Sequence, residues 1–178
     1  MHGTFADDAL REWLLRFKHG GRPDLAEELG LALARAVREA GGPPGPHPFV
    51  TAVPLHPLRR IERGYDQADL LARVLAERLG VEHVRALRRS RPTPPQGSAG
   101  TSRRDNVRGA FEVRVPRERL RGRSVLLVDD VVASGGTVRA CARALRERGA
   151  LRVWIVAVAR GGDRRGATAG GAAGAAPT

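Results

Sequence analysis

The apolar residues of the chain recur with helical spacing in some stretches and form short continuous runs in others. Helical spacing first appears at Leu10, Trp13, Leu14 and Phe17. A second set with the same spacing reaches about Glu39, so we expect two N-terminal helices within residues 5–40. A third set consists of Leu71, Leu75 and Leu79. It predicts a helix that ends before Gly80, because glycine commonly follows the last helical turn.

Short apolar runs bounded by turn residues predict the strands. They lie at residues 49–53, 84–87, 111–115, 125–128 and 151–159. The run at 111–115 is expected at an edge, whereas the last run is apolar enough for a strand that is buried on both faces. At 178 residues, the chain has the length of one α/β domain, which we place at residues 1–160. The Gly- and Ala-rich tail at 161–178 lacks aliphatic anchors, and we expect it to be disordered.

One stretch combines a predicted strand, two acids, a turn and a helix. The apolar run at 125–128 ends in Asp129 and Asp130, and the helical spacing that follows includes Cys141, which we expect in the core. The turn between them contains only small residues, namely Ala133, Ser134, Gly135, Gly136 and Thr137. Backbone N–H groups of such a turn can converge on an anion, and the helix adds the positive end of its dipole. The stretch therefore predicts a phosphate site.

Two acids beside a phosphate site would repel a bare phosphate. They suit a ligand that also carries hydroxyl groups or Mg²⁺, and a sugar phosphate with a metal-bound pyrophosphate has both. Residues 125–137 resemble the phosphoribosyl pyrophosphate (PRPP) signature of type I phosphoribosyltransferases. The resemblance implies that Asp129 and Asp130 hold the ribose hydroxyls and help to hold Mg²⁺, and that the turn binds the 5′-phosphate.

Other interpretations of this stretch are less favourable. A strand, a glycine turn and a helix occur in any α/β protein, but two unpaired acids at the end of a strand are costly without a ligand or solvent. A dinucleotide fold would need a Gly-x-Gly-x-x-Gly motif, which the chain lacks. A response-regulator receiver would need several further strand–helix units after Asp130, and too little chain remains for them.

A cluster of arginines follows the strand at 49–53. Arg59, Arg60 and Arg63 lie within five positions, and guanidinium groups match phosphate oxygens, although a solvated basic loop is the alternative. Residues 53–72 resemble the ComF family of phosphoribosyltransferase-like proteins, with Asp66 in place of the family's usual Asn. The resemblance makes these arginines candidates for binding pyrophosphate.

The polar region at 88–110 has no apolar periodicity and is unusually long for a loop of a compact domain. It too resembles the ComF pattern, in which Thr-x-x-Gln precedes Arg-x-x-Asn-Val-x-x-Ala-Phe. The resemblance implies a flexible lid that folds over PRPP and excludes water. Arg103 and Arg104 are the lid charges that we expect to stabilise the leaving group.

Composition narrows the choice of partners. The net charge of +12 favours polyanions such as PRPP or a nucleic-acid backbone, and Lys18 is the only lysine. Aromatic residues make up 4% of the chain, so platforms on which bases could stack are scarce. Neither a membrane-spanning run nor a signal peptide is evident, so we expect no membrane insertion and a cytoplasmic location. ComF members usually begin with a cysteine zinc module, whereas Cys141 is the only cysteine here.

Together these patterns predict a type I phosphoribosyltransferase fold, with a parallel sheet flanked by helices. The resemblance implies a pentosyl-type glycosyltransferase that moves a phosphoribosyl group from Mg–PRPP to a nitrogen acceptor. No residue has an evident role in reading a base, so the acceptor stays open. The alternative is a non-catalytic competence factor for DNA uptake that binds PRPP or single-stranded DNA. Its partners would include proteins of the competence machinery, and a homodimer is a further partner to test.

Overall fold

The computed structural model describes residues 8–19, 21–90 and 109–161. Its helices are α1 (Asp8–His19), α2 (Leu25–Glu39), α3 (Pro57–Arg63), α4 (Gln67–Leu79), α5 (Gly136–Glu147) and the 3₁₀ turn η1 (Arg117–Arg119). Its strands are β1 (Phe49–Ala52), β2 (Glu82–His83), β3 (Leu87–Arg89), β4 (Phe111–Val113), β5 (Ser124–Val132) and β6 (Arg152–Arg160). Most of the predicted lid and tail lie outside the described residues.

Four strands form one sheet in the order β2-β1-β5-β6, and all of its neighbours are parallel. Strands β3 and β4 form a separate antiparallel pair. The predicted α/β fold with a parallel sheet flanked by helices is therefore confirmed. Because β1 and β5 are neighbouring parallel strands, their carboxyl ends lie side by side at the same end of the sheet.

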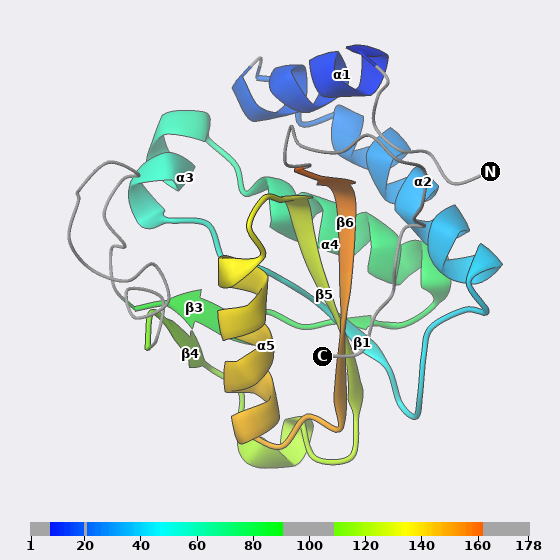
Figure 1. The fold of residues 1–178 in the computed structure, drawn as a ribbon, viewed down its shortest axis with the longest axis vertical. Coiled ribbons are helices and arrows are strands. Elements are labelled where there is room, and N and C mark those ends of the chain that lie inside the picture. The colour runs from blue at the N-terminus through cyan, green and yellow to red at the C-terminus, as the bar shows by residue number, and fades with distance from the viewer. Residues whose placement is uncertain (1–7, 20, 91–108, 162–178) are drawn as a thin grey trace.

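Helices cover both faces of this sheet (Figure 1). On one face α2 and α4 pack over β1, β5 and β6, with Leu71, Leu75 and Leu126 fully buried. On the other face α5 packs with the β3–β4 pair, and Cys141 is buried there as predicted. The approach of α2 to α4 is close, since a Cβ atom on Gly30 would lie 2.5 Å from Val74 Cγ1. Glycine is therefore required at that crossing.

The single strand predicted at 84–87 is wrong, because this run leaves one sheet and enters another. Before it, β2 pairs with β1, and the N–H of Val84 still donates to the carbonyl of Val50 at 2.9 Å. The N–H of Ala86 donates instead to Oγ1 of Thr51, at 3.2 Å. From Leu87 onward the chain pairs with β4, which is the predicted edge strand in a shorter form.

The arginine cluster predicted as a loop is also different, because Pro57–Arg63 form the short helix α3. Nδ1 of His56 accepts the N–H of Leu58 at 3.3 Å, and Pro57 occupies the first turn, where proline is tolerated. Gly64 ends the helix with a φ of 76°. His56 and Pro57 thus mark the start of this short helix, and Gly64 marks its end.

Strand β6 lies at the edge of the sheet, although it is apolar throughout its middle. Val153 and Val156 point to opposite faces and join the two cores, so both faces are covered in part. Trp154 and Ile155 are only partly buried. The predicted burial on both faces therefore holds for particular positions and not for the whole strand.

Candidate active site

The acid pair lies within β5, not at the end of a strand as predicted. Strand β1 ends at Ala52, which pairs with Val128, whereas β5 continues to Val132 beside β6. The ladder with β6 pairs Asp129 with Ala157 and so extends the strand beyond the acids. Asp129 and Asp130 thus lie where β5 has lost one neighbour and kept the other. That position leaves their side chains at the open carboxyl end of the sheet.

Burial and mutual repulsion set the electrostatics of the pair. Burial raises the pKa of Asp129 well above its ordinary value, and the negative charge of Asp130 raises it further. Backbone amides contribute two contacts: the N–H of Asp130 donates to Asp129 Oδ1 at 2.9 Å, and that of Val131 donates to Asp130 Oδ1 at 2.7 Å. The buried thiol of Cys141 also has a raised pKa, mainly because of burial and in addition because of the negative charge of Asp129. The pair is therefore short of positive charge.

The small-residue turn follows β5 directly. Ala133 and Ser134 are exposed, and Gly135 has a φ of 74°, which side chains other than glycine rarely adopt. Gly136 and Thr137, predicted in the turn, are instead the first residues of α5. The N–H groups of a first helical turn lack helical acceptors, which is the property that a phosphate site needs.

Sequence reasoning missed Arg139, which lies over this turn. Its Nη2 donates to the carbonyl of Ser134 at 2.8 Å. A Cβ atom on Gly135 would lie 2.6 Å from its Nη1, so the glycine also makes room for the guanidinium. Its position in the sequence could have identified it, because Arg139 follows Gly135 by four residues, and residues four apart on a helix lie on the same side.

Lys18 was also absent from the predicted site residues, and it reaches the acid pair from outside the sheet. Its Nζ lies 3.1 Å from Asp130 Oδ2, and both side chains are largely buried. Lys18 lies near the end of α1, which is held there by Tyr65: the Tyr65 hydroxyl donates to the carbonyl of Phe17 at 2.5 Å, and the two rings lie 6.0 Å apart. A lone lysine in an arginine-rich chain was the available signal.

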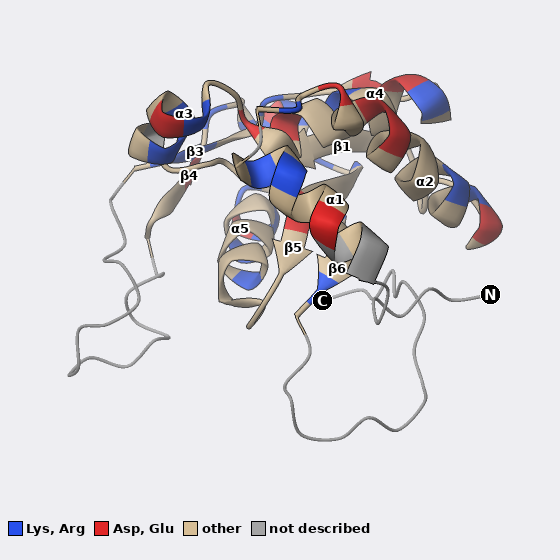
Figure 2. Cartoon of the chain, turned by 90° about the horizontal axis from the view of Figure 1, so that it is seen from above, with Lys and Arg blue, Asp and Glu red and all other residues tan. Residues whose placement is uncertain are grey.

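A cleft of about 560 Å³ opens beside Lys18, between the end of α1 and α3. Its lining consists of Lys18, His19, Gly21, Arg59, Glu62, Arg63 and Tyr65. Two of the three predicted pyrophosphate ligands, Arg59 and Arg63, thus share the cleft with Lys18. Arg60 is exposed on α3 and is not part of the lining. Figure 2 shows blue, basic segments on both α3 and α1.

The residues present fit Mg²⁺ that arrives with its own phosphate ligands. Mg²⁺ usually takes one or two carboxylates from a protein and completes its shell with water and substrate phosphate. Asp129 and Asp130 offer two carboxylates whose charges repel each other. In residues 8–19, 21–90 and 109–161, no cluster of three or more His, Cys, Asp or Glu side chains could form a complete metal cage.

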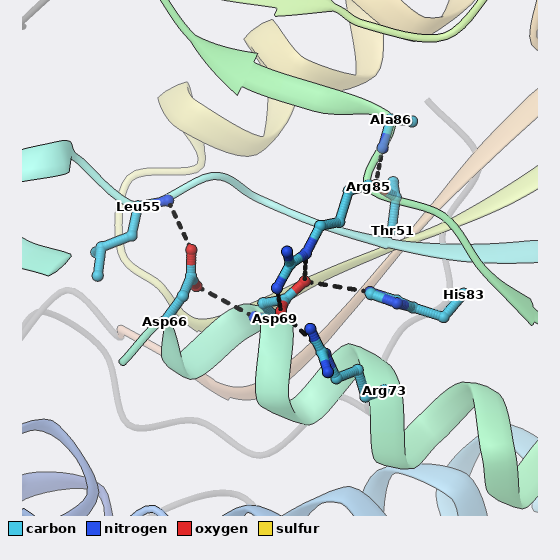
Figure 3. A network of polar contacts seen from close by, with 8 residues as sticks. All are labelled: Thr51, Leu55, Asp66, Asp69, Arg73, His83, Arg85 and Ala86. Atoms are coloured by element: carbon cyan, nitrogen blue, oxygen red, sulfur yellow. Dashed lines mark hydrogen bonds and ion pairs between the residues drawn. The ribbon is translucent and has the colours of Figure 1, made fainter. Parts of the chain in front are cut away.

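A second acid, Asp69 of α4, lies in a very different setting (Figure 3). Arg85 Nη2 and Arg73 Nε donate to Asp69 Oδ2 at 2.6 Å and 3.1 Å, and His83 Nε2 lies 3.2 Å from Oδ1. Burial opposes ionisation here, but contacts with His83 and Arg85 outweigh it and hold the pKa of Asp69 well below its usual range. This cluster ties α4 to the β2–β3 segment, and no pattern in the sequence indicated it.

Asp66 stands where the ComF pattern has asparagine, and it accepts two backbone hydrogen bonds. Its Oδ1 accepts the N–H of Asp69 at 3.1 Å and its Oδ2 accepts that of Leu55 at 3.3 Å. Burial raises the pKa of Asp66 in spite of these contacts. The side chain caps α4 and needs no donor, so the lost amide N–H leaves both of these contacts intact.

The predicted lid charges Arg103 and Arg104 lie outside the described residues. In the parts of the chain that the structure covers, no helix is both long and apolar enough to cross a membrane. No ligand role is tested by these observations, so the predicted roles of the acid pair, the turn and the arginines stay predictions.

Comparisons with family models and with known protein sequences indicate the same family. Residues 63–171, more than half of the chain, match the phosphoribosyl transferase domain. The DNA utilization protein YhgH of Escherichia coli is 32% identical over 161 residues, which are 86% of this chain and 70% of that protein. Competence protein F of Haemophilus influenzae is 34% identical over 113 residues, 62% of this chain. The chain spans about half the length of that relative, 49%.

The solved structures agree on the fold. The glutamine PRPP amidotransferase from B. subtilis superposes with a TM-score of 0.54 at 21% identity, over 82% of this chain and 30% of that one. The expected resemblance is therefore confirmed at the level of family and fold. The chain belongs to the ComF family of proteins that carry the phosphoribosyl transferase domain.

Proposed function

We propose that the chain binds Mg–PRPP at the acid pair and transfers its phosphoribosyl group to a nitrogen acceptor. In this reaction the bond from C1 of the ribose to pyrophosphate breaks, and pyrophosphate leaves with the electron pair. A bond from C1 to the acceptor nitrogen forms, and that nitrogen loses a proton. The observation that carries the proposal is the partly buried pair Asp129–Asp130 beside a glycine turn that opens a helix.

The residues divide the ligand between them. Asp129 and Asp130 would accept hydrogen bonds from the ribose hydroxyls and would hold Mg²⁺. Ala133, Ser134, Gly135, Gly136 and Thr137 would surround the 5′-phosphate, with Arg139 at its side. Arg59 and Arg63 would bind pyrophosphate from the cleft that they line. When bound, Mg²⁺ would supply positive charge that offsets the charge of the leaving pyrophosphate.

Arg60 is the weakest of the three arginine assignments. Its side chain is exposed and does not line the cleft, and its charge acts on Asp66. Nη1 of Arg63 donates to Oε1 of Gln67 at 3.2 Å, which aims it from the end of α3. We therefore expect a loss of pyrophosphate affinity on removal of Arg59 or Arg63, and a smaller loss on removal of Arg60.

Calorimetric titration of the full chain with Mg–PRPP tests binding. Replacement of both acids (Asp129→Asn with Asp130→Asn) should weaken binding at least about tenfold, since two charge-assisted contacts are lost. The matched control removes two exposed acids, Asp24→Asn with Glu118→Gln, and so changes the net charge equally. Equal affinity in the acid-pair variant and the control would contradict the assignment of the site.

Pyrophosphate release tests the transfer itself. Mg–PRPP is incubated with the protein and a panel of nitrogen acceptors, and release above the rate of PRPP hydrolysis is measured. Binding without release for any acceptor would contradict the transferase and leave a protein that only binds PRPP. A labelled single-stranded oligonucleotide, titrated at low and high salt, tests the remaining alternative of DNA binding.

A further inference from the structure

Lys18 has an unusual combination of properties. It is the only lysine of the chain, it comes from a helix outside the sheet, and its side chain is only 23% exposed where it meets Asp130. The backbone next to Lys18 is held in place, because Tyr65 forms a hydrogen bond to the Phe17 carbonyl and a ring contact with the Phe17 side chain. A burial of this kind restricts a long side chain and costs rotamer entropy. The contact therefore calls for a reason beyond surface charge pairing.

The charges at the site do not balance. Within the described residues, Lys18 makes the only ion pair with Asp130, and Asp129 makes none. One ammonium pairs with Asp130, and the neighbouring carboxyl group of Asp129 in β5 has no cation of its own among the described residues. The site is therefore suited to a cation of higher charge than lysine carries, and a divalent ion would compete with Lys18 for Asp130 Oδ2.

The surroundings give the ammonium a second place to go. Lys18 also lines the cleft to which α3 contributes Arg59, Glu62 and Arg63, so it borders both the acid pair and this cleft, whose charged side chains are mostly basic. A divalent ion on the acids would repel the ammonium, and an anion in the cleft would attract it. Because Tyr65 ties the end of α1 to the rest of the chain, the exchange would take place by rotation of the Lys18 side chain.

We propose that Lys18 is a placeholder cation, which pairs with Asp130 in the free protein and moves to the pyrophosphate when Mg–PRPP binds. This inference rests on the proposed function for its ligand, and it adds a residue that acts on both halves of the ligand. Before binding, Lys18 offsets part of the repulsion between the two carboxyl groups. Afterwards it becomes a third cation, with Arg59 and Arg63, on the leaving group.

Removal of the ammonium should change two affinities in opposite directions. In Lys18→Met, Mn²⁺ alone should bind roughly fivefold more tightly, because its competitor is gone, whereas Mg–PRPP should bind roughly fivefold more weakly. Mn²⁺ binding is followed by electron paramagnetic resonance and Mg–PRPP binding by calorimetry. Lys18→Arg, which keeps the charge, should restore most of the affinity for Mg–PRPP.

Arg16→Met serves as the matched control, because Arg16 is an exposed cation of the same helix that pairs with Glu12. It should change neither affinity. Affinities that fall together in Lys18→Met, or a Mn²⁺ affinity that does not rise, would overturn the proposal. If the wild type fails to bind Mg–PRPP, the proposed function fails, and the Mn²⁺ measurement still decides whether Lys18 competes with a metal.

A measurement on the wild type does not depend on the folding of any variant. Because Lys18 is the only lysine, a protein with isotope-labelled lysine gives one Cε signal. This signal should shift on addition of Mg²⁺ and shift further, to a new position, with Mg–PRPP. A signal that stays in place while calorimetry records saturation would contradict the movement of the side chain.

Discussion

Asp69 and Asp129 are both largely buried acids, and the fold surrounds them in opposite ways. Asp69 contacts Arg73, His83 and Arg85, and the last two outweigh the cost of its burial and lower its pKa. Asp129 has burial and a second carboxylate as its main influences, and both raise its pKa. The first arrangement stabilises the folded chain, whereas the second carries an electrostatic cost that protonation or a bound cation removes.

This comparison separates a structural acid from a binding acid. Buried ions that are fully paired hold elements together, as Asp69 holds α4 to the β2–β3 segment (Figure 3). Buried carboxylates that lack cationic partners occur at binding sites, where a ligand supplies the opposite charge. The difference depends on the number and sign of neighbours and not on burial, which the two acids share.

The largest effect is expected when the structural acid is removed. Asp69→Ala leaves Arg85 and His83 without their carboxylate, and we expect a loss of about 3 kcal/mol in the free energy of unfolding. Urea unfolding at pH 7 measures it. Because the pKa of Asp69 is lowered, its contribution is present above the ordinary carboxyl range and is lost as the pH falls through its folded value. A deficit that persists unchanged in strong acid would contradict the assignment.

Removal of the binding acid should have the opposite sign. Asp129→Asn abolishes a carboxylate that is costly to ionise, and we expect a gain of about 1 kcal/mol at neutral pH together with the loss of ligand binding. A raised pKa means that the stability from Asp129 is complete below about pH 4 and is lost as the pH rises toward its folded value. The gain of the variant should therefore be near zero in acid and grow with pH. A variant less stable than wild type at pH 8 would contradict this account.

A smaller effect is expected for one of the cations around Asp69. The Arg73 side chain is about half exposed, at 53%, and Asp69 keeps Arg85 and His83 when it is lost. Arg73→Gln should therefore lower stability by only about 0.5 kcal/mol. Thermal unfolding at low and high salt measures the change, which should shrink as salt screens the pair. A loss as large as that of Asp69→Ala would mean that Arg85 and His83 do not compensate for the loss of Arg73.

The smallest effect is expected where the chain departs from the ComF pattern. Asp66→Asn keeps an oxygen acceptor for the N–H of Asp69, and Asn and Asp are comparable at the start of a helix. The longer contact with Leu55, at 3.3 Å, is the one at risk. We expect a change within about 0.5 kcal/mol. Urea unfolding decides the point, and a loss above about 1.5 kcal/mol would show that the carboxylate is required.

Several features of the fold could be predicted because their causes are local. The apolar run before Asp129, the small turn and the helical spacing after it are each set by neighbouring residues. The same holds for α4, which ends at Leu79 with Gly80 in the left-handed conformation, as its spacing indicates. The family resemblance then added the parallel sheet, which no local pattern specifies.

Other features depended on residues far away in the chain. Strand β5 runs on to Val132 because β6 pairs beside it, so the acids that look like a strand end lie within a strand. The run at 84–87 divides between two sheets because Thr51 and β4 attract its two halves. The apolar pattern of these runs is the same whichever strand they pair with, so the available hydrogen-bond partners decide where each strand begins and ends.

What the sequence alone determined is therefore the alternation of helices and strands, the acid pair and the turn that follows it, because these rest on short-range pattern and chain stereochemistry. The tertiary structure decided which charges meet. It brought Lys18 to Asp130 and two arginines and a histidine to Asp69, and it left Asp129 beside another acid. Charge acts through space and depends on burial, and neither distance nor burial between remote segments is written in the order of the residues.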